Sequence, residues 1–209
     1  MKVLLLNGSP NAGGCTDTAL RELEEELRRQ GVETELCHVG LEPVRGCTAC
    51  EGCHRAGDNR CVFDGDAVNR VLEKAAYCDG FVFGAPVYFA GVAGTMKCLL
   101  DRVFYAGRPL FCGKPGTVVV SARRAGTTAA YDQLNKYIGI SGMLAVPSRY
   151  WNMVHGYTAE DTKKDQEGLQ IMRDLGKNMA WLLRLLELGK ENGLVMPEFE
   201  AKTETNFIH

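Results

Sequence analysis

The segment Val3-Leu4-Leu5-Leu6-Asn7-Gly8-Ser9-Pro10 decides the fold class of this 209-residue chain. Its first half is a short, continuously apolar run, which is typical of a strand buried on both faces of a sheet. A glycine-rich loop follows as far as Gly14. The next residues form a helical pattern with an apolar stripe at Leu20, Leu23 and Leu27. A buried strand, a glycine-rich turn and an amphipathic helix indicate the first unit of a parallel α/β sheet.

The chain repeats this alternation as far as residue 146. Further strands are predicted at Val32–Val39, whose charged residues suit a sheet edge, and at Phe81–Phe83, Thr117–Val120 and Met143–Val146. Between them lie helices with apolar stripes at residues 68–75, 96–103 and 134–138, and Thr95 is expected to cap the second. Five strands alternating with helices predict a parallel sheet with helices on both faces.

The C-terminal quarter is expected to contain a long helix and a tail. Thr158 and Asp161 resemble a capping box, and a helical pattern runs from there towards Leu188. Residues from Leu194 to His209 lack periodicity and are expected to be extended. We therefore expect one domain over residues 1–190, with an inserted cysteine-rich loop at 46–65, and an extended tail over residues 191–209.

Composition excludes several classes of protein. Hydrophobic residues make up 45% and charged residues 24% of the chain, as in an ordinary soluble globular protein. Lys and Arg number 24 against 26 Asp and Glu, which disfavours a nucleic-acid partner. No apolar run approaches the ~18 residues that a membrane span needs. An odd count of nine cysteines, with no signal peptide, predicts a cytoplasmic protein with reduced thiols.

The loop from Gly8 to Thr18 has the outline of a phosphate site, because amides and hydroxyls meet there at a helix N-terminus. It lacks the G-x-G-x-x-G of dinucleotide sites and the G-K-[ST] of P-loops. Neutral donors without a cation suit a monophosphate, as flavodoxin-like proteins bind FMN. A plain tight turn with a helix cap is the alternative. Asp17 would repel phosphate, so it is expected to point outward or to cap the helix.

Two other loops follow buried strands and are expected at the same sheet edge. In Pro86-Val87-Tyr88-Phe89, the proline fixes a turn and the aromatic side chains offer surface to a flat ring. The segment from Ser121 to Gly126 supplies backbone groups for the other end of that ring. Within it, Arg123 and Arg124 are candidates for the phosphates of a nicotinamide nucleotide, or are plain surface charges.

Four segments together resemble the NADPH-dependent FMN reductase and iron–sulfur flavoprotein branch of the flavodoxin-like superfamily: Leu6–Pro10, Gly84–Tyr88, Lys97–Arg102 and Tyr150–Gly156. The resemblance covers roughly residues 2–190. It implies a three-layer sandwich with five parallel strands in the order 2-1-3-4-5. It also implies non-covalent FMN, with its phosphate in the first loop, its isoalloxazine on the second, and NAD(P)H as electron donor.

The expected FMN contacts come from all three loops: Ser9, Asn11, Cys15, Thr16, Thr18, Pro86, Val87, Tyr88, Phe89, Ser121, Ala122 and Gly126. Cys15 stands where the family often has asparagine. Its expected contact is therefore through the backbone, since the departure weakens a side-chain role.

Four cysteines form a local C-x2-C-x2-C-x7-C pattern at Cys47, Cys50, Cys53 and Cys61. This spacing resembles the compact motif of iron–sulfur flavoproteins and predicts one four-iron four-sulfur cluster. A metal-free thiol hairpin and a zinc site are the alternatives. The other cysteines beside apolar segments are expected in the core: Cys37, Cys78, Cys98 and Cys112.

We predict an oxidoreductase that passes electrons from NAD(P)H or a ferredoxin-like donor through FMN, and through the cluster where one is present, to an acceptor. No catalytic acid or base is expected, because the flavin is the redox centre. The alternatives are a cluster-free reductase of quinone, nitro, azo or flavin compounds and a non-enzymatic electron carrier. Trp151 and His155 are candidates for the acceptor pocket, and the long helix suggests a homodimer or homotetramer.

Overall fold

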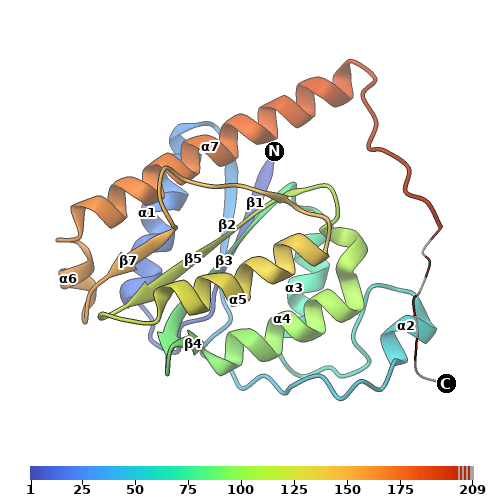
Figure 1. The fold of residues 1–209 in the computed structure, drawn as a ribbon, viewed down its shortest axis with the longest axis horizontal. Helices are drawn as coiled ribbons and strands as arrows, with labels where there is room; N and C mark the ends of the chain where they lie inside the picture. Colours follow the sequence, from blue (N-terminus) through green and yellow to red (C-terminus); the bar gives the residue numbers. More distant parts are fainter. Residues whose placement is uncertain (202, 204, 206, 208–209) are drawn as a thin grey trace.

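A parallel sheet lies between two layers of helices in the computed structural model, which describes residues 1–201, 203, 205 and 207 (Figure 1). Its principal strands run in the order β2-β1-β3-β5-β6. They are β1 (Lys2–Asn7), β2 (Glu33–His38), β3 (Gly80–Tyr88), β5 (Pro115–Ala122) and β6 (Leu144–Ala145). All four pairings between them are parallel, and β2 pairs with β1 alone. Numbered among themselves, these five strands have the predicted order 2-1-3-4-5.

Two further strands bring the sheet to seven and were not expected from the sequence. β4 (Gly91–Val92) runs antiparallel to the end of β3 and makes a hairpin there. β7 (Met153–His155) pairs parallel with the last residues of β5, whereas β6 pairs only with its first two. The fifth position of the sheet is therefore shared by β6 and β7. Each is only two or three residues long, which is too short for an apolar pattern to show.

Buried side chains bridge the gap between β6 and β7. The Thr117 hydroxyl donates to the Val146 carbonyl over 2.8 Å and accepts from Asn152 Nδ2 over 2.9 Å. The Asn152 carbonyl accepts from the Val120 amide at 3.0 Å. Asn152 is fully buried, so these bonds take the place of ladder bonds that the interrupted strand does not make.

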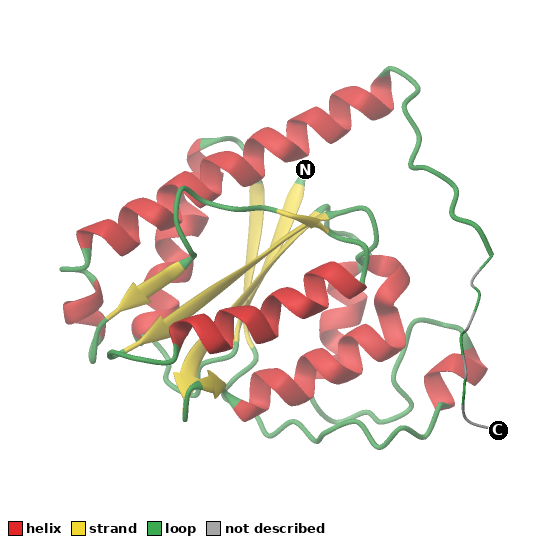
Figure 2. Ribbon diagram, in the orientation of Figure 1, coloured by secondary structure: helices red, strands yellow, loops and turns green. Residues whose placement is uncertain are grey.

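Three helices cover one face of the sheet and two cover the other (Figure 2). α3 (Ala67–Ala75), α4 (Gly94–Gly107) and α5 (Thr127–Ile140) share a core cluster with one face, and the 3-10 turn η1 (Arg108–Leu110) follows α4. α1 (Cys15–Arg29) and α7 (Gln166–Glu191) pack on the opposite face. The short α2 (Gly52–Ala56) lies within the cysteine loop, and α6 (Ala159–Thr162) precedes α7.

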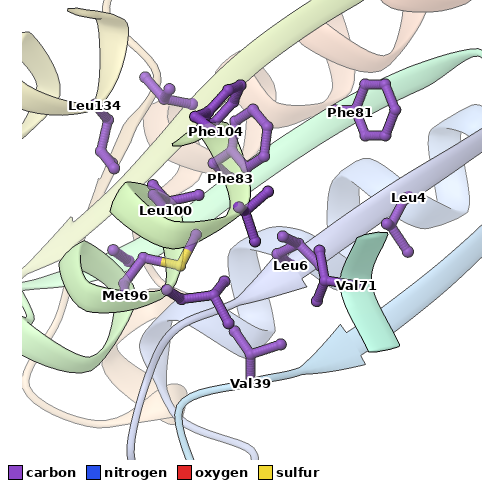
Figure 3. Close-up of a cluster of buried hydrophobic side chains, with 14 of the residues drawn as sticks. Leu4, Leu6, Val39, Val71, Phe81, Phe83, Met96, Leu100, Phe104 and Leu134 are labelled. Atoms are coloured by element: carbon purple, nitrogen blue, oxygen red, sulfur yellow. The ribbon is translucent and has the colours of Figure 1, made fainter. Parts of the chain in front are cut away.

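The central strands supply apolar residues to both clusters. Leu4 and Leu6 of β1 face the α3–α4–α5 side with Phe81 and Phe83 of β3 (Figure 3), whereas Leu5 belongs to the opposite cluster. Successive side chains of a strand point to opposite faces. A strand covered on both sides is therefore apolar without interruption, which explains the run of leucines in β1.

Two expectations about helix ends need correction. Thr95 is not a cap, because α4 begins at Gly94 with Ala93 as N-cap and no side-chain cap bond. The Ala93 amide donates to the Pro86 carbonyl, so the β3–β4 hairpin sets where the helix starts. The Thr158–Asp161 capping box is present, but it starts α6. The long helix begins separately, where Asp165 caps Gly168.

The expected extended tail over residues 191–209 starts at Glu191, the last residue of α7, and residues 202, 204, 206, 208 and 209 of it lie outside the described residues. Residues 194–201 carry no helix or strand and are exposed. In the described part of the chain, no helix combines the length and apolar character needed to cross a bilayer.

Replacing Thr117 by valine is expected to destabilise the protein by about 2 kcal/mol, although the two side chains have nearly the same shape. The change leaves the Val146 carbonyl and the Asn152 amide buried without their partner. Urea unfolding measures the loss. Thr128→Val makes the same exchange on the exposed side of α5 and serves as control, with an expected change within ~0.5 kcal/mol. Equal effects of the two variants would contradict the bridging role.

Candidate active site

The loops after β1, β3 and β5 meet at the carboxyl edge of the sheet. The Gly8 amide donates to the Gly84 carbonyl at 2.8 Å, which joins the first loop to β3. The hydroxyls of Thr16 and Ser121 lie 2.8 Å apart and join the start of α1 to the end of β5. The structure therefore brings together the three segments that the sequence singled out.

Hydrogen bonds within the first loop order it and leave the start of α1 open. Asn7 Oδ1 accepts from the Ser9 amide at 3.0 Å, and Ser9 Oγ accepts from the Asn11 amide at 3.1 Å. Gly14 is the N-cap of α1, and no side chain in the described part of the chain caps the helix. The first amides of a helix have no intrahelical acceptor and carry the positive end of its dipole. This helix end suits a phosphate.

The side chains expected to bind phosphate already have partners within the protein. Thr16 is buried and bonds Ser121, while Thr18 Oγ1 donates to the Gly14 carbonyl at 3.1 Å. Cys15 Sγ contacts the carbonyl oxygens of Gly156 and Thr158 at 3.4 and 3.3 Å. The available donors at this end are thus backbone amides.

Asp17 does not point outward and does not cap α1, contrary to the sequence expectation. Its carboxylate is buried and accepts from Arg21 Nε at 2.7 Å and from Asn7 Nδ2 at 3.3 Å. The pairing with Arg21 compensates the negative charge one turn into the helix. A phosphate at the helix start is therefore compatible with Asp17.

The second loop is a tight hairpin between β3 and β4. Tyr88 pairs with Gly91 across it, and both turn residues, Phe89 and Ala90, have left-handed φ values of 48° and 60°. Two consecutive left-handed residues match the type I′ turn, which non-glycine residues adopt at a cost. The Val92 amide donates to Gln133 of α5 at 3.1 Å and holds the hairpin in place. Phe89 is completely exposed and Tyr88 is half-exposed, so the turn presents aromatic surface at the sheet edge.

The third loop packs tightly against this hairpin through Gly126. This glycine has φ 92°, and a Cβ there would lie 2.7 Å from Cα of Ala90. Ser121 and Ala122 are the last, buried residues of β5, and the Ala122 carbonyl accepts from the Gly156 amide. The closeness of the two loops therefore depends on the absence of a side chain at position 126.

An open hollow of about 590 Å³ lies beside the third loop, lined by Arg123, His155, Gly156, Tyr157 and Asp161. Arg123 and His155, which the sequence singled out for separate roles, thus line the same hollow. Trp151 does not belong to this lining and is half-exposed beside Tyr150, with ring centroids 4.9 Å apart. Arg124 is exposed and also lies outside the lining.

The four cysteines of the inserted loop line one small cavity of about 20 Å³, together with Arg102 and Tyr105 of α4. All nine cysteines of the chain are free thiols. Cys53 and Cys61 are half-buried and Cys47 and Cys50 are exposed. Left-handed φ values of 50° at Ala49 and 56° at Glu51 turn the backbone around the cavity. Such strain gathers at functional sites.

Arg102 directs a buried positive charge at this cavity. Its side chain is almost completely buried, and Nε and Nη2 lie 3.4 and 3.3 Å from Cys61 Sγ. The guanidinium also donates to the Phe63 carbonyl at 2.8 Å and pairs with the Asp66 carboxylate. A buried guanidinium can offset negative charge that a metal and its sulfur ligands bring to this cavity. Hydrogen bonds from backbone amides, chiefly Gly52, hold the pKa of Cys50 below its usual value.

The described residues contain no preformed site for a single metal ion, and zinc remains one of the alternatives from the sequence. Among the described residues, no three His, Cys, Asp or Glu side chains are arranged around the position of one ion. A tetrahedral zinc site needs three or four ligands around a single point. Of the cysteines outside the loop, Cys78 is fully buried, and burial raises its pKa to about 11, whereas Cys37, Cys98 and Cys112 are half-buried.

Comparison with known proteins connects these features with a family. The sequence profile of NADPH-dependent FMN reductase matches residues 1–158. The chain belongs to this family. It is also 32% identical to an iron–sulfur flavoprotein of Methanocaldococcus jannaschii, over 90% of this chain and 100% of that protein. The chain is therefore an FMN-binding oxidoreductase, as its sequence predicts.

Solved structures confirm the flavodoxin-like fold. RosB with its bound intermediate 8-demethyl-8-formylriboflavin-5'-phosphate superposes with a TM-score of 0.72 at 16% identity, covering 99% of this chain and 92% of RosB. A flavodoxin from the domain Archaea superposes with a TM-score of 0.61 at 14% identity, covering 88% of this chain and 99% of the flavodoxin. At such low identity, these likenesses concern the fold alone.

Sequence reasoning missed three residues that organise these sites. Arg102 belongs to the family-like segment Lys97–Arg102, and a basic residue within an apolar helical pattern is the sequence signal that points to it. Asn7 bonds Ser9 and Asp17, and Gln133 bonds β4. Their partners lie on other turns or elements, so only the folded chain reveals these roles.

Replacing Gly126 by alanine is expected to weaken FMN binding at least tenfold, because the new Cβ pushes the third loop away from the hairpin. Gly31→Ala is the matched control, since Gly31 has φ 76° and open space around it. Both variants are expected to lose about 1–2 kcal/mol of stability through left-handed strain. Fluorescence titration of the FMN-free proteins measures the affinity. Normal FMN affinity in Gly126→Ala would contradict the proposed closeness of the loops.

Proposed function

We propose that this family member is an NAD(P)H-dependent flavoenzyme that also carries a four-iron four-sulfur cluster, and that it delivers electrons to a ferredoxin-like protein or a small-molecule acceptor. The observation that carries the proposal is the shared cavity of Cys47, Cys50, Cys53 and Cys61, with the buried Arg102 guanidinium on Cys61. Relatives named iron–sulfur flavoproteins support it.

For FMN, the proposed phosphate site is the open N-terminus of α1, formed by the loop from Ser9 to Thr18, with Ser9, Thr16 and Thr18 ordering the backbone. The ring lies against the hairpin of Pro86–Phe89, and Ser121, Ala122 and Gly126 border its other side. When bound, FMN accepts a hydride and releases electrons singly or in pairs. The protein orients the flavin with neutral groups, and we assign no side chain as acid or base.

The nicotinamide nucleotide is assigned to the hollow beside the third loop. Arg123 and His155 both line it, and a guanidinium suits phosphate. The hollow is next to the residues that contact Cys15, at the start of α1. A nucleotide held there would lie beside the flavin site.

The cluster fits the cysteine loop by the number and kind of its ligands. Four thiolates are the ligand set of a four-iron cluster, and each binds a different iron, so no single ion position is required. Amides add to the charge compensation by Arg102, since the Ala49 amide donates to Cys47 Sγ at 3.5 Å. The cysteine cavity and the flavin hairpin lie at opposite ends of α4. Tyr105, near the C-terminal end of α4, lines the cysteine cavity, and the flavin hairpin adjoins the N-terminal end of the helix. At 1.5 Å per residue, about 16 Å of helix separate Gly94 from Tyr105.

We further propose a homo-oligomer in the reducing cytoplasm, built from one FMN domain over residues 1–190 and a tail over 191–209. The outer face of α7 supports association, because Trp181, Leu185 and Leu188 are exposed at helical spacing. Nine free thiols suit a reducing compartment.

Addition of NADPH to the FMN-loaded protein without oxygen is expected to bleach the flavin absorbance near 450 nm. Arg123→Ala is expected to raise the KM for NADPH about tenfold or more, because a charge-assisted contact to phosphate is lost. Arg124→Ala, the neighbouring exposed arginine outside the hollow, is the control and should change the KM less than twofold. A flavin that dithionite reduces but NADPH and NADH do not would instead identify an electron carrier.

Protein prepared without oxygen is expected to contain four irons and four acid-labile sulfides per chain. Cys61→Ser and Cys53→Ser are expected to lower the iron content to half or less while FMN content is retained. Cys98→Ser, a half-buried cysteine outside the loop, is the matched control and should keep its iron. Flavin without iron in the unmodified protein would make it a cluster-free reductase.

A further inference from the structure

A groove between α4 and α5 lies apart from the flavin loops and has no assigned role. The two helices share one face of the sheet (Figure 1), and the cysteine loop closes one end of the groove. Its volume is about 700 Å³, enough for a small organic molecule. Cys53 and Tyr105 line both this groove and the cysteine cavity.

Aromatic side chains form the walls of the groove. Phe104 stacks on Tyr137 with ring centroids 5.3 Å apart and an interplanar angle of 26°. Tyr105 stacks on His54 with centroids 5.5 Å apart and an angle of 15°. Ile140 adds an aliphatic edge at the opening. Flat aromatic surfaces of this kind favour a planar aromatic ligand.

The groove also contains a buried hydroxyl without a partner. Ser141 follows α5, lines the groove and is 0% exposed. Within the described part of the chain, its Oγ makes no hydrogen bond. An unpaired buried hydroxyl costs stability and is rare in folded proteins. A ligand oxygen would satisfy it.

Charges of both signs surround the groove, so neither an anionic nor a cationic ligand is favoured. The guanidinium-bearing Arg108 and the carboxylate-bearing Asp101 both line it, and Lys97 pairs with Asp101 at 2.5 Å. The Tyr137 hydroxyl donates to the same carboxylate. Burial and the hydrogen bond to Asp101 raise the pKa of Tyr137, so this tyrosine remains a neutral donor. A neutral ligand therefore experiences the least electrostatic repulsion in the groove.

We propose that this groove is a binding site for a small, neutral, planar aromatic compound that bears a carbonyl oxygen, which accepts a hydrogen bond from Ser141. The aromatic walls contact its ring, and its position brings it against Cys53. The groove is a separate site from the flavin and cluster sites. Binding of a ligand in the groove does not depend on the function proposed above.

Two probes of nearly equal shape test the proposal on the FMN-loaded protein. 1-Indanone carries a ring carbonyl, and indane is the same bicycle without it; neither reacts with thiols or with oxidised flavin. Ligand-observed NMR titration measures both affinities. Ser141→Ala is expected to weaken 1-indanone binding about fivefold and to leave indane unchanged. Ile140→Ala is expected to weaken both probes by a similar factor, because it removes apolar wall.

Ser148→Ala is the matched control, since its hydroxyl bonds the Ile171 carbonyl outside the groove, and it should change neither affinity. Equal binding of 1-indanone and indane to the unmodified protein would overturn the proposal. So would a 1-indanone affinity that Ser141→Ala and Ile140→Ala do not change. FMN content, measured on the same samples, reports separately on the flavin site.

Discussion

The structure depends on the covering of both faces of its sheet. Leu4, Leu5 and Leu6 are all fully buried, because alternate side chains of β1 enter opposite helical layers. A strand that is buried on both faces has no exposed face for polar or charged side chains. Functional groups are therefore displaced to the ends of strands, and parallel pairing places those ends at one edge. The flavin site follows from this constraint.

The three flavin loops meet at that edge because their backbones pack closely and a few buried hydrogen bonds join them. Gly84 lets Leu20 pack against β3, since a Cβ there would lie 2.7 Å from the leucine side chain. Gly126 does the same between the third loop and the hairpin. Thr16 and Ser121 then join the loops through their hydroxyls. The loops are ordered by the protein itself, which leaves backbone amides free to meet a phosphate.

The cysteine loop, unlike the flavin loops, is not positioned by the ends of strands. It has little regular structure and takes its shape from α4, which supplies Arg102 and Tyr105 to the cavity wall. The same helix borders the flavin hairpin at one end and the aromatic groove along its side. α4 thus adjoins all three sites, and it supplies residues to two of them, the cysteine cavity and the aromatic groove.

Sequence patterns predicted the alternating strands and helices and the loops of the site, because continuous apolar runs and glycine-rich turns are local signals. The strand order came from the family resemblance. The spacing of the four cysteines also identified them as one candidate metal-binding group. Sequence patterns missed β4 and β7, which are too short to show a pattern, and they misjudged Asp17 and Thr95.

The sequence by itself determined which segments are buried strands, and therefore which loops reach the functional edge. Only the tertiary structure decided which donors remain free there and which buried groups lack partners. It showed that Thr16 bonds Ser121 and that Arg21 compensates the charge of Asp17. It also showed that the buried Ser141 hydroxyl has no hydrogen-bond partner among the described residues. The physical reason is that burial and hydrogen bonding depend on residues distant in the chain, whereas periodicity records only the near neighbours.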